Sequence, residues 1–254
     1  MLLSIISEGI ATGNWRELII EILLLIPSIL FALSFHEAAH GYVAYLMGDR
    51  TAYNLGRVTL NPAKHLNPIG TLMMLIFGFG WANPVPINAR NFKNPKWGMA
   101  LTAIAGPISN MLSGCVGAIL VAFLHYSRLV LIATYLPSLA GEYYFVVTIE
   151  MITTFFTYFS LINLIYAFFN LIPLPPFDGS RFFFTFLPVK WYFGIMKVER
   201  YIMMGVFLLL LLWSRIFDFP SPFSFLAEKT YLFVANGAIA IIDIVYSLIL
   251  NLIA

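Results

Sequence analysis

Charged side chains are scarce in this sequence. Asp, Glu, Lys and Arg make up 10% of its 254 residues, whereas an ordinary soluble domain carries about 25%. Hydrophobic residues make up 61% of the chain, and the mean hydropathy is +0.88. This composition excludes an ordinary soluble protein and indicates an integral membrane protein.

Cysteine is nearly absent as well. Cys115 is the single cysteine, which excludes an intrachain disulfide framework and a cysteine-based zinc site. The net charge of +2 is too small to suggest nucleic acid as a partner. Because no polar stretch is long enough for a separate soluble domain, we expect one membrane-embedded domain over residues 1–254. Its core would cover residues 18–190, with accessory C-terminal helices over 201–254.

The long apolar runs predict an all-α polytopic membrane protein with about five transmembrane helices. Residues 124–144 would form a loop that could include a partly helical apolar piece around residues 129–135. The run 68–82 has only 15 residues. Because about 20 residues are needed to cross the hydrocarbon core, we expect this run to enter and leave by the same face. Residues 52–60 and 84–88 alternate apolar with polar side chains, and could add small β-strands at the cytoplasmic side. The predicted membrane-spanning helices cover residues 18–47, 97–123, 144–172, 201–217 and 231–253.

Basic residues gather on one side of this layout. The loops 49–67, 83–96 and 173–200 would share that side, which the positive-inside rule makes cytoplasmic. The N-terminus would then lie outside, in a multi-pass protein of the plasma membrane. The first side holds ten basic residues, namely Arg50, Arg57, Lys64, Arg90, Lys93, Lys96, Arg181, Lys190, Lys197 and Arg200, and the other holds four, namely Arg16, Arg128, Arg215 and Lys229.

The sequence His36-Glu37-Ala38-Ala39-His40 lies inside the first apolar run. Histidines four residues apart share one face of a helix, so both imidazoles can reach one Zn²⁺. Glu37, beside them, can take a proton from a metal-bound water. This pattern also arises by chance in many chains. However, an acid and two histidines are costly to keep in a membrane-length apolar segment, and this favours a polar site.

A third zinc ligand is available after the third predicted span. The prolines of residues 173–176 stop that helix, and Asp178 follows on the same side of the membrane as the two histidines. We expect Gly179 to allow a turn with positive φ beside it. Asp178 could alternatively serve only as the N-cap of the next helical segment.

Three further polar residues are candidates for a role in the site. Asn110 and Asn170 are amides inside predicted spans, and either could stabilise an oxyanion or bind substrate. Asn110 could instead bridge helices, because the small residues around it predict a close helix contact. His65 could be a ligand or a substrate contact, although its polar loop favours a surface or interfacial position. The small residues are Gly106, Ser109, Ser113, Gly114 and Gly117.

These motifs together resemble the site-2 proteases, the intramembrane zinc metalloproteases of peptidase family M50. The similarity covers most of residues 30–190. It is nearest to the compact prokaryotic branch without a PDZ or CBS domain, although Asn67 stands where that branch usually has Asp. The matching stretches are HExxH at 36–40, Gly-Arg-Val-Thr-Leu-Asn-Pro at 56–62, His-Leu-Asn-Pro-Ile-Gly-Thr at 65–71, Gly-Pro-Ile-Ser-Asn at 106–110, and Asn170 to Gly179.

The resemblance implies that His36, His40 and Asp178 bind one Zn²⁺ per chain and that Glu37 is the general base. The implied function is hydrolysis of peptide bonds in or near transmembrane segments of protein substrates within the lipid bilayer. Two alternatives stay open at this point, a catalytically silent scaffold that binds membrane helices and a metal-binding membrane carrier. The oligomeric state and the identity of the substrate are not determined by the sequence.

Overall fold

The computed structural model describes residues 6, 9, 11–70, 82–135, 142–216 and 222–253. Within these ranges the chain is mostly helical. The long helices are α2 (Trp15–Met47), α5 (Pro95–Tyr135), α6 (Glu142–Asn170), α8 (Val189–Ile216) and α9 (Pro222–Ile253). The short helices are α3 (Thr51–Asn54), η1 (Pro62–Lys64), η2 (Ala89–Asn91) and α7 (Asp178–Phe184).

Helix α2 has clear signals at both ends. The side chain of Asn14 accepts a hydrogen bond from the Glu17 amide and so caps the first turn. Gly48 ends the helix with φ of 115°, a left-handed conformation that glycine adopts without the steric cost that Cβ imposes. The chain can therefore turn sharply just after the helix that carries both histidines.

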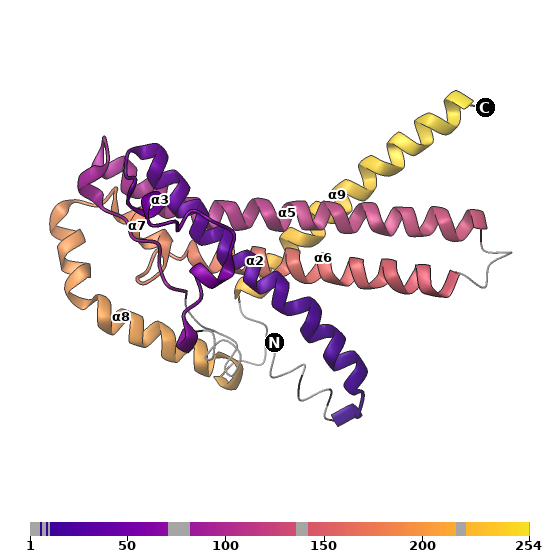
Figure 1. Ribbon diagram of the computed structural model, residues 1–254, viewed down its shortest axis with the longest axis horizontal. Coiled ribbons are helices and arrows are strands. Elements are labelled where there is room, and N and C mark those ends of the chain that lie inside the picture. Colours follow the sequence, from indigo (N-terminus) through magenta and orange to yellow (C-terminus); the bar gives the residue numbers. More distant parts are fainter. Residues whose placement is uncertain are drawn as a thin grey trace.

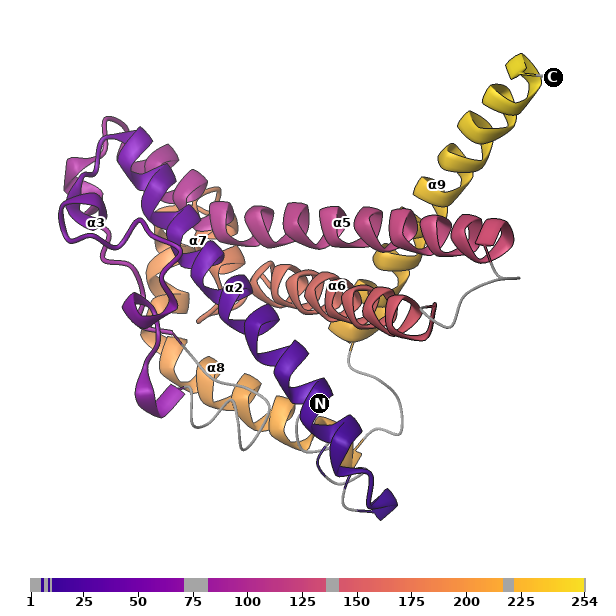
Figure 2. The ribbon, with the colours of Figure 1, turned by 45° about the vertical axis from the view of Figure 1, so that its right-hand side comes forward.

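Helices α5 and α6 lie side by side, and α2 crosses them (Figures 1 and 2). Small residues allow the close approach of α5 and α6, because a Cβ on Gly114 would lie 2.6 Å from Leu164 Cγ. The Ser160 hydroxyl also donates across this contact to the Gly114 carbonyl oxygen, at 2.6 Å. The close helix contact predicted from the small residues is thus confirmed.

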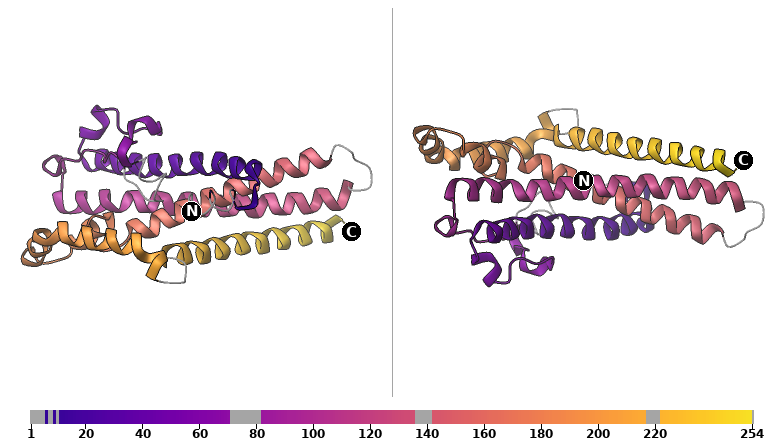
Figure 3. Two further views of the ribbon diagram at one scale, coloured as in Figure 1. Left: turned by 90° about the horizontal axis from the view of Figure 1, so that it is seen from below. Right: turned by 90° about the horizontal axis from the view of Figure 1, so that it is seen from above.

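Four helices among the described residues are long and apolar enough to cross a membrane. They lie within α2, α5, α6 and α9, which confirms an all-α polytopic membrane protein. The span predicted at 201–217 is not among them. That predicted span runs past Ile216, the last described residue of α8, and Arg200 and Arg215 bracket the apolar residues of its described part. Figure 3 shows α8 toward one end of the bundle, while α9 packs along α5 and α6.

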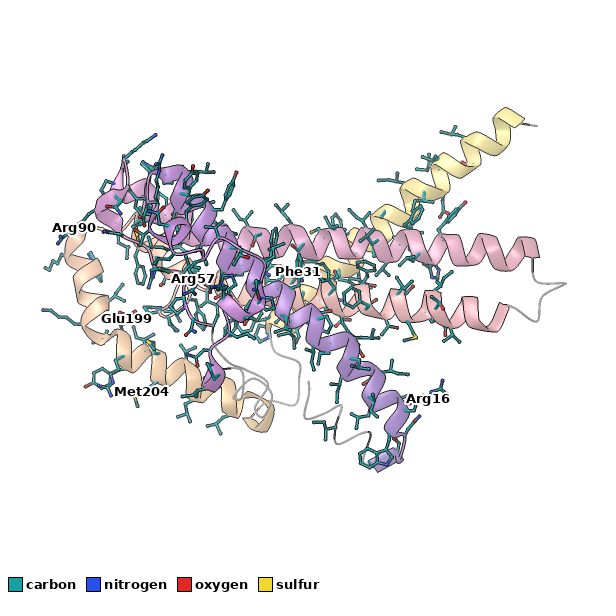
Figure 4. The ribbon with its side chains drawn as sticks, in the orientation of Figure 1. Arg16, Phe31, Arg57, Arg90, Glu199 and Met204 are labelled. Carbon is teal, nitrogen blue, oxygen red and sulfur yellow. The ribbon has the colours of Figure 1, made fainter. Side chains whose placement is uncertain are left out.

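Connections gather at the two ends of the bundle. Helices α3 and α7 and the start of α5 lie at one end, and the adjoining ends of α5 and α6 lie at the other (Figures 1 and 3). Arg57 and Arg90 lie toward the first end, and Arg16 lies away from it, at the N-terminal end of α2 (Figure 4).

The connections between the helices differ in part from those predicted from the sequence. Helix α5 continues to Tyr135, so the loop predicted from residue 124 is wrong over residues 124–128, whereas the helical piece expected around residues 129–135 is confirmed as part of α5. The small strands expected near residues 52–60 and 84–88 do not form, and the described ranges contain one isolated antiparallel bridge, between Leu66 and Ala82. Most of the re-entrant segment expected at 68–82 lies outside the described residues.

Candidate metal centre

Two histidines on α2 point their rings at each other. Four residues separate His36 and His40, so both occupy one helix face, and their Nε2 atoms lie 3.0 Å apart. Both side chains are buried, with 5% and 6% of their surface exposed. The helical spacing predicted from the sequence is therefore realised.

Asp178 reaches the same point from the other side. Helix α6 ends at Asn170, and the proline-containing turn that follows leads into α7, which begins at Asp178. The Asp178 Oδ2 atom lies 2.9 Å from His36 Nε2 and 3.1 Å from His40 Nε2. The N-cap residue of α7 is Phe177, and Asp178 is the first residue of the helix, so the structure does not contain the alternative of Asp178 as a helix cap.

Gly179 does not have the positive φ that we expected of it. The glycines with positive φ are Gly13, Gly48 and Gly56, and Gly179 is not among them. A Cβ at Gly179 would instead collide with the Leu171 carbonyl group at the end of α6. Glycine is needed here because α7 packs tightly on that backbone, and this packing brings Asp178 to the histidines.

A second set of hydrogen bonds orients both imidazoles. His36 Nδ1 lies 2.6 Å from Asn110 Oδ1, and His40 Nδ1 lies 2.7 Å from the Thr102 carbonyl oxygen. The Asn110 amide nitrogen donates to Ala32 O and Asn163 Oδ1, so its oxygen must face His36. Each Nδ1 therefore carries a proton. Each Nε2 faces the Asp178 carboxylate, to which it donates when it is protonated and beside which it can bind a metal ion when it is not.

The donor set fits a divalent cation. Three lone pairs directed at one point repel one another unless a cation, either a proton or a metal ion, lies among them. The three ligand atoms lie within 4.8 Å of one another, and their closest separations are 2.9–3.1 Å. In a tetrahedral zinc site with bonds of about 2.0–2.1 Å, ligand atoms are about 3.3 Å apart. Two imidazoles and one carboxylate also leave a fourth position open, as catalytic zinc sites do.

Electrostatics keeps the Asp178 carboxyl charged. Burial by itself raises its pKa, but the positive charge of His40 and the hydrogen bonds from both rings outweigh burial and hold the pKa below its ordinary range. A charged carboxylate is the form that binds a metal ion.

Helix α5 leaves space for the ligands at one position. A Cβ on Gly106 would lie 2.5 Å from His40 Nε2 and 2.6 Å from His36 Nε2. Any side chain here would therefore occupy the space beside the metal-binding nitrogens. This explains the glycine of the Gly-Pro-Ile-Ser-Asn sequence by a close approach to the site.

A cavity of about 1060 Å³ opens beside the three ligands. Glu37 and Asn170 both line it together with His36, His40 and Asp178. Glu37 is half-buried and accepts a hydrogen bond from the Val85 amide, at 3.0 Å. The Asn170 amide nitrogen donates to the Tyr166 carbonyl oxygen, at 3.0 Å, within α6.

Two of the candidate residues lie elsewhere. Asn110 is fully buried behind His36, and its amide is used in bonds to α2 and α6, so it bridges helices rather than facing the cavity. The expectation of a surface or interfacial His65 is wrong, because that ring is 0% exposed and donates to the Thr59 carbonyl oxygen. His65 is also not part of the His36–His40–Asp178 group.

Sequence reasoning missed two residues that support the site. Asn163 holds the Asn110 amide, and a polar side chain within an apolar span is the signal that could have found it. Thr102 acts on His40 through its backbone carbonyl. Every residue carries that group, so no residue type at position 102 could have signalled it.

The space at Gly106 leads to a prediction. Gly106→Ala should abolish or strongly weaken zinc binding, because the new methyl group would overlap the two Nε2 atoms. Zinc content of the purified protein, measured by mass spectrometry, checks this. Gly237→Ala is the matched control, since a Cβ there has open space. Full zinc occupancy in the Gly106 variant would contradict the geometry.

The Asn110 bond leads to a second prediction. Asn110→Ala should lower zinc affinity about 10- to 100-fold, as expected for loss of a partner that orients a metal-binding histidine. Competition titration with a chelator measures the affinity. Asn170→Ala should change it much less, since the Asn170 amide bonds only within α6. Equal affinities for wild type and the Asn110 variant would remove the orienting role.

Comparisons with known proteins agree with this geometry. The sequence matches the family described as "Peptidase family M50" over residues 24–213. It is also 40% identical over 164 residues to the Bacillus subtilis (strain 168) protein called "Putative zinc metalloprotease YwhC". The aligned residues cover 65% of this chain and 69% of that protein. No solved structure shows significant similarity to the chain. The chain therefore belongs to peptidase family M50, and it is a multi-pass membrane zinc metallopeptidase.

Proposed function

We propose that this protein is an intramembrane protease that hydrolyses peptide bonds in or near transmembrane segments of its substrates. The observation that carries the proposal is the meeting of His36, His40 and Asp178 at one point, with Glu37 lining the same cavity. The metal ligands come from a helix that can span the membrane and from the break after another such helix. Chemistry at this place would act on chains within the bilayer.

His36, His40 and Asp178 would hold one zinc ion per chain. Zinc bound by two neutral imidazoles and one carboxylate supplies a water molecule of lowered pKa and an electrophile for a carbonyl oxygen. The hydrogen bonds from the two Nδ1 atoms keep both rings in the orientation that this binding requires.

Glu37 would be the general base. Its carboxylate accepts a proton from the attacking water as the new carbon–oxygen bond forms at the scissile carbonyl. The same carboxyl group then gives this proton to the amide nitrogen as the carbon–nitrogen bond breaks. Asn170 lines the cavity and is our candidate donor for the oxyanion or for the substrate backbone.

The substrate would bind in an extended form. In a helix each carbonyl oxygen is bonded to the amide four residues on, so the scissile carbonyl must be released before water can attack. The walls of the cavity offer apolar side chains to such a segment, among them Leu33, Val85 and Ile87. We place the site toward the cytoplasmic side of the plasma membrane, with the N-terminus outside, on the distribution of basic residues.

The proposal predicts that Glu37→Gln binds zinc as the wild type does but cleaves no substrate. The change keeps the shape of the side chain and removes its ability to take a proton. Cleavage of a single-span model peptide in detergent, with zinc content measured on the same samples, checks this. If wild type and variant both bind zinc and neither cleaves, a scaffold that binds membrane helices explains the protein better. If the variant cleaves as fast as wild type, Glu37 is not the base.

A further inference from the structure

A short segment runs along the C-terminal half of α2, beside the candidate base. Residues 83–88, called the strap here, form neither helix nor strand. Near its middle, the Val85 amide donates to Glu37 Oε2, at 3.0 Å. Val85 itself is only 6% exposed, and its side chain lies close to α2, because a Cβ on Gly41 would be 3.3 Å from Val85 Cγ1. The strap thus contacts Glu37 through the Val85 amide. The position of this amide depends on the contacts that fix the two ends of the strap.

The C-terminal end of the strap is held by Asp49. The Asn88 amide donates to Asp49 Oδ2, at 2.6 Å. The other oxygen, Oδ1, accepts from the Thr51 amide and hydroxyl and from the Asn91 side-chain amide. Asp49 is fully buried just after α2, and its carboxylate is surrounded by neutral donors. Burial raises the pKa of Asp49, and these hydrogen bonds lower it further than burial raises it, so the carboxyl stays charged.

The chain around Asp49 ties the same two segments together by backbone contacts. The Lys93 amide donates to the Met47 carbonyl oxygen, at 3.1 Å. A Cβ on Gly48 would lie 3.0 Å from the Asn91 carbonyl oxygen. The end of α2 and the residues after the strap are therefore packed as one unit, with Asp49 at its centre.

The N-terminal end of the strap is held by Arg57. Its Nη2 donates to the carbonyl oxygens of Asn83 and Pro84, at 2.7 and 3.4 Å. The Asn83 amide donates to the His65 carbonyl oxygen, at 2.7 Å. The Asn67 side-chain amide donates to Asn83 Oδ1, at 2.9 Å, a bond that an ionised aspartate at position 67 could not donate.

The side chains of Arg57 and Asp49 thus fix the two ends of the strap. Between these ends, the Val85 amide donates a hydrogen bond to Glu37. We propose that Asp49 and Arg57 are positioning residues for Glu37, acting through the strap to hold the Val85 amide against the Glu37 carboxylate. This inference rests on the proposed function, because it needs Glu37 to act as the base. Neither residue is a metal ligand in this arrangement, and Asp49 does not line the cavity.

A positioning role differs from a merely structural one in what its loss changes. If either tether is removed, the Glu37 carboxylate loses a fixed donor and moves relative to the substrate, while the three metal ligands keep their own bonds. A displacement of about 1 Å can cost about a hundredfold in rate. We therefore expect kcat to fall while metal binding and the geometry of the metal stay unchanged.

The test compares Asp49→Asn and Arg57→Gln with wild type, using a single-span model peptide that wild type cleaves. Both variants should bind one equivalent of zinc and, when loaded with Co²⁺, show the wild-type visible absorption spectrum. Their kcat should fall about tenfold or more, with KM changed less than about threefold. Arg57→Lys should recover part of the loss, since an ammonium group can still donate to the Asn83 carbonyl oxygen. Hydrogen exchange should increase at residues 83–88 in both loss variants.

Two controls separate positioning from general destabilisation. Ser160→Ala removes a buried hydrogen bond between α5 and α6, far from the strap along the chain, and should lower the melting temperature without lowering kcat. Arg90→Gln removes a positive charge just beyond the strap at an exposed residue, and should leave kcat at the wild-type value (Figure 4). If Asp49→Asn and Arg57→Gln keep wild-type kcat, or if Ser160→Ala loses as much kcat at equal melting temperature, the inference is wrong. A wild-type protein that binds zinc and cleaves nothing would overturn the proposed function, and this inference with it.

Discussion

Two imidazole nitrogens and one carboxylate oxygen lie about 3 Å from one another in the buried part of a membrane protein. Electron pairs at such separations repel strongly where water cannot screen them, so this arrangement is stable only around a positive charge. These groups could hold a metal ion at this point, as the proposed function requires. Much of the remaining structure can be read as the means of bringing these three atoms to one point and keeping them there.

Each helix or loop around His36, His40 and Asp178 helps to position the side chains of the site. Helix α2 sets the spacing of the histidines, and α5 supplies the gap at Gly106 and the Asn110 oxygen behind His36. The break after α6 lets Asp178 approach, because Gly179 allows α7 to pack on the end of that helix. The loops between α2 and α5 then bring the Val85 amide to Glu37. In the proposed function, metal binding and the positioning of Glu37 would therefore be served by different parts of the fold.

Some of this could be predicted from the sequence because it follows from local geometry. His36, Glu37 and His40 follow from helical periodicity, and Asp178 from a proline break on the same side of the membrane. The membrane class and most helix positions follow from apolar runs, but α8 shows the limit, because charges bracket its apolar part. The Thr102 carbonyl, the Val85 amide and the burial of His65 depend on tertiary contacts between distant segments. No local pattern encodes contacts of that kind, and the same holds for Gly179, whose role depends on the end of α6.

X-ray absorption at the zinc edge of the purified protein measures directly which atoms bind the metal ion. We expect scattering from two imidazole rings and from further oxygen ligands at about 2.0–2.1 Å, with no sulfur shell. Removal of the Asp178 carboxylate by Asp178→Ala should change the oxygen shell and leave the imidazole scattering in place. A spectrum without imidazole scattering, or one that His36→Ala and Asp178→Ala leave unchanged, would show that the metal binds elsewhere.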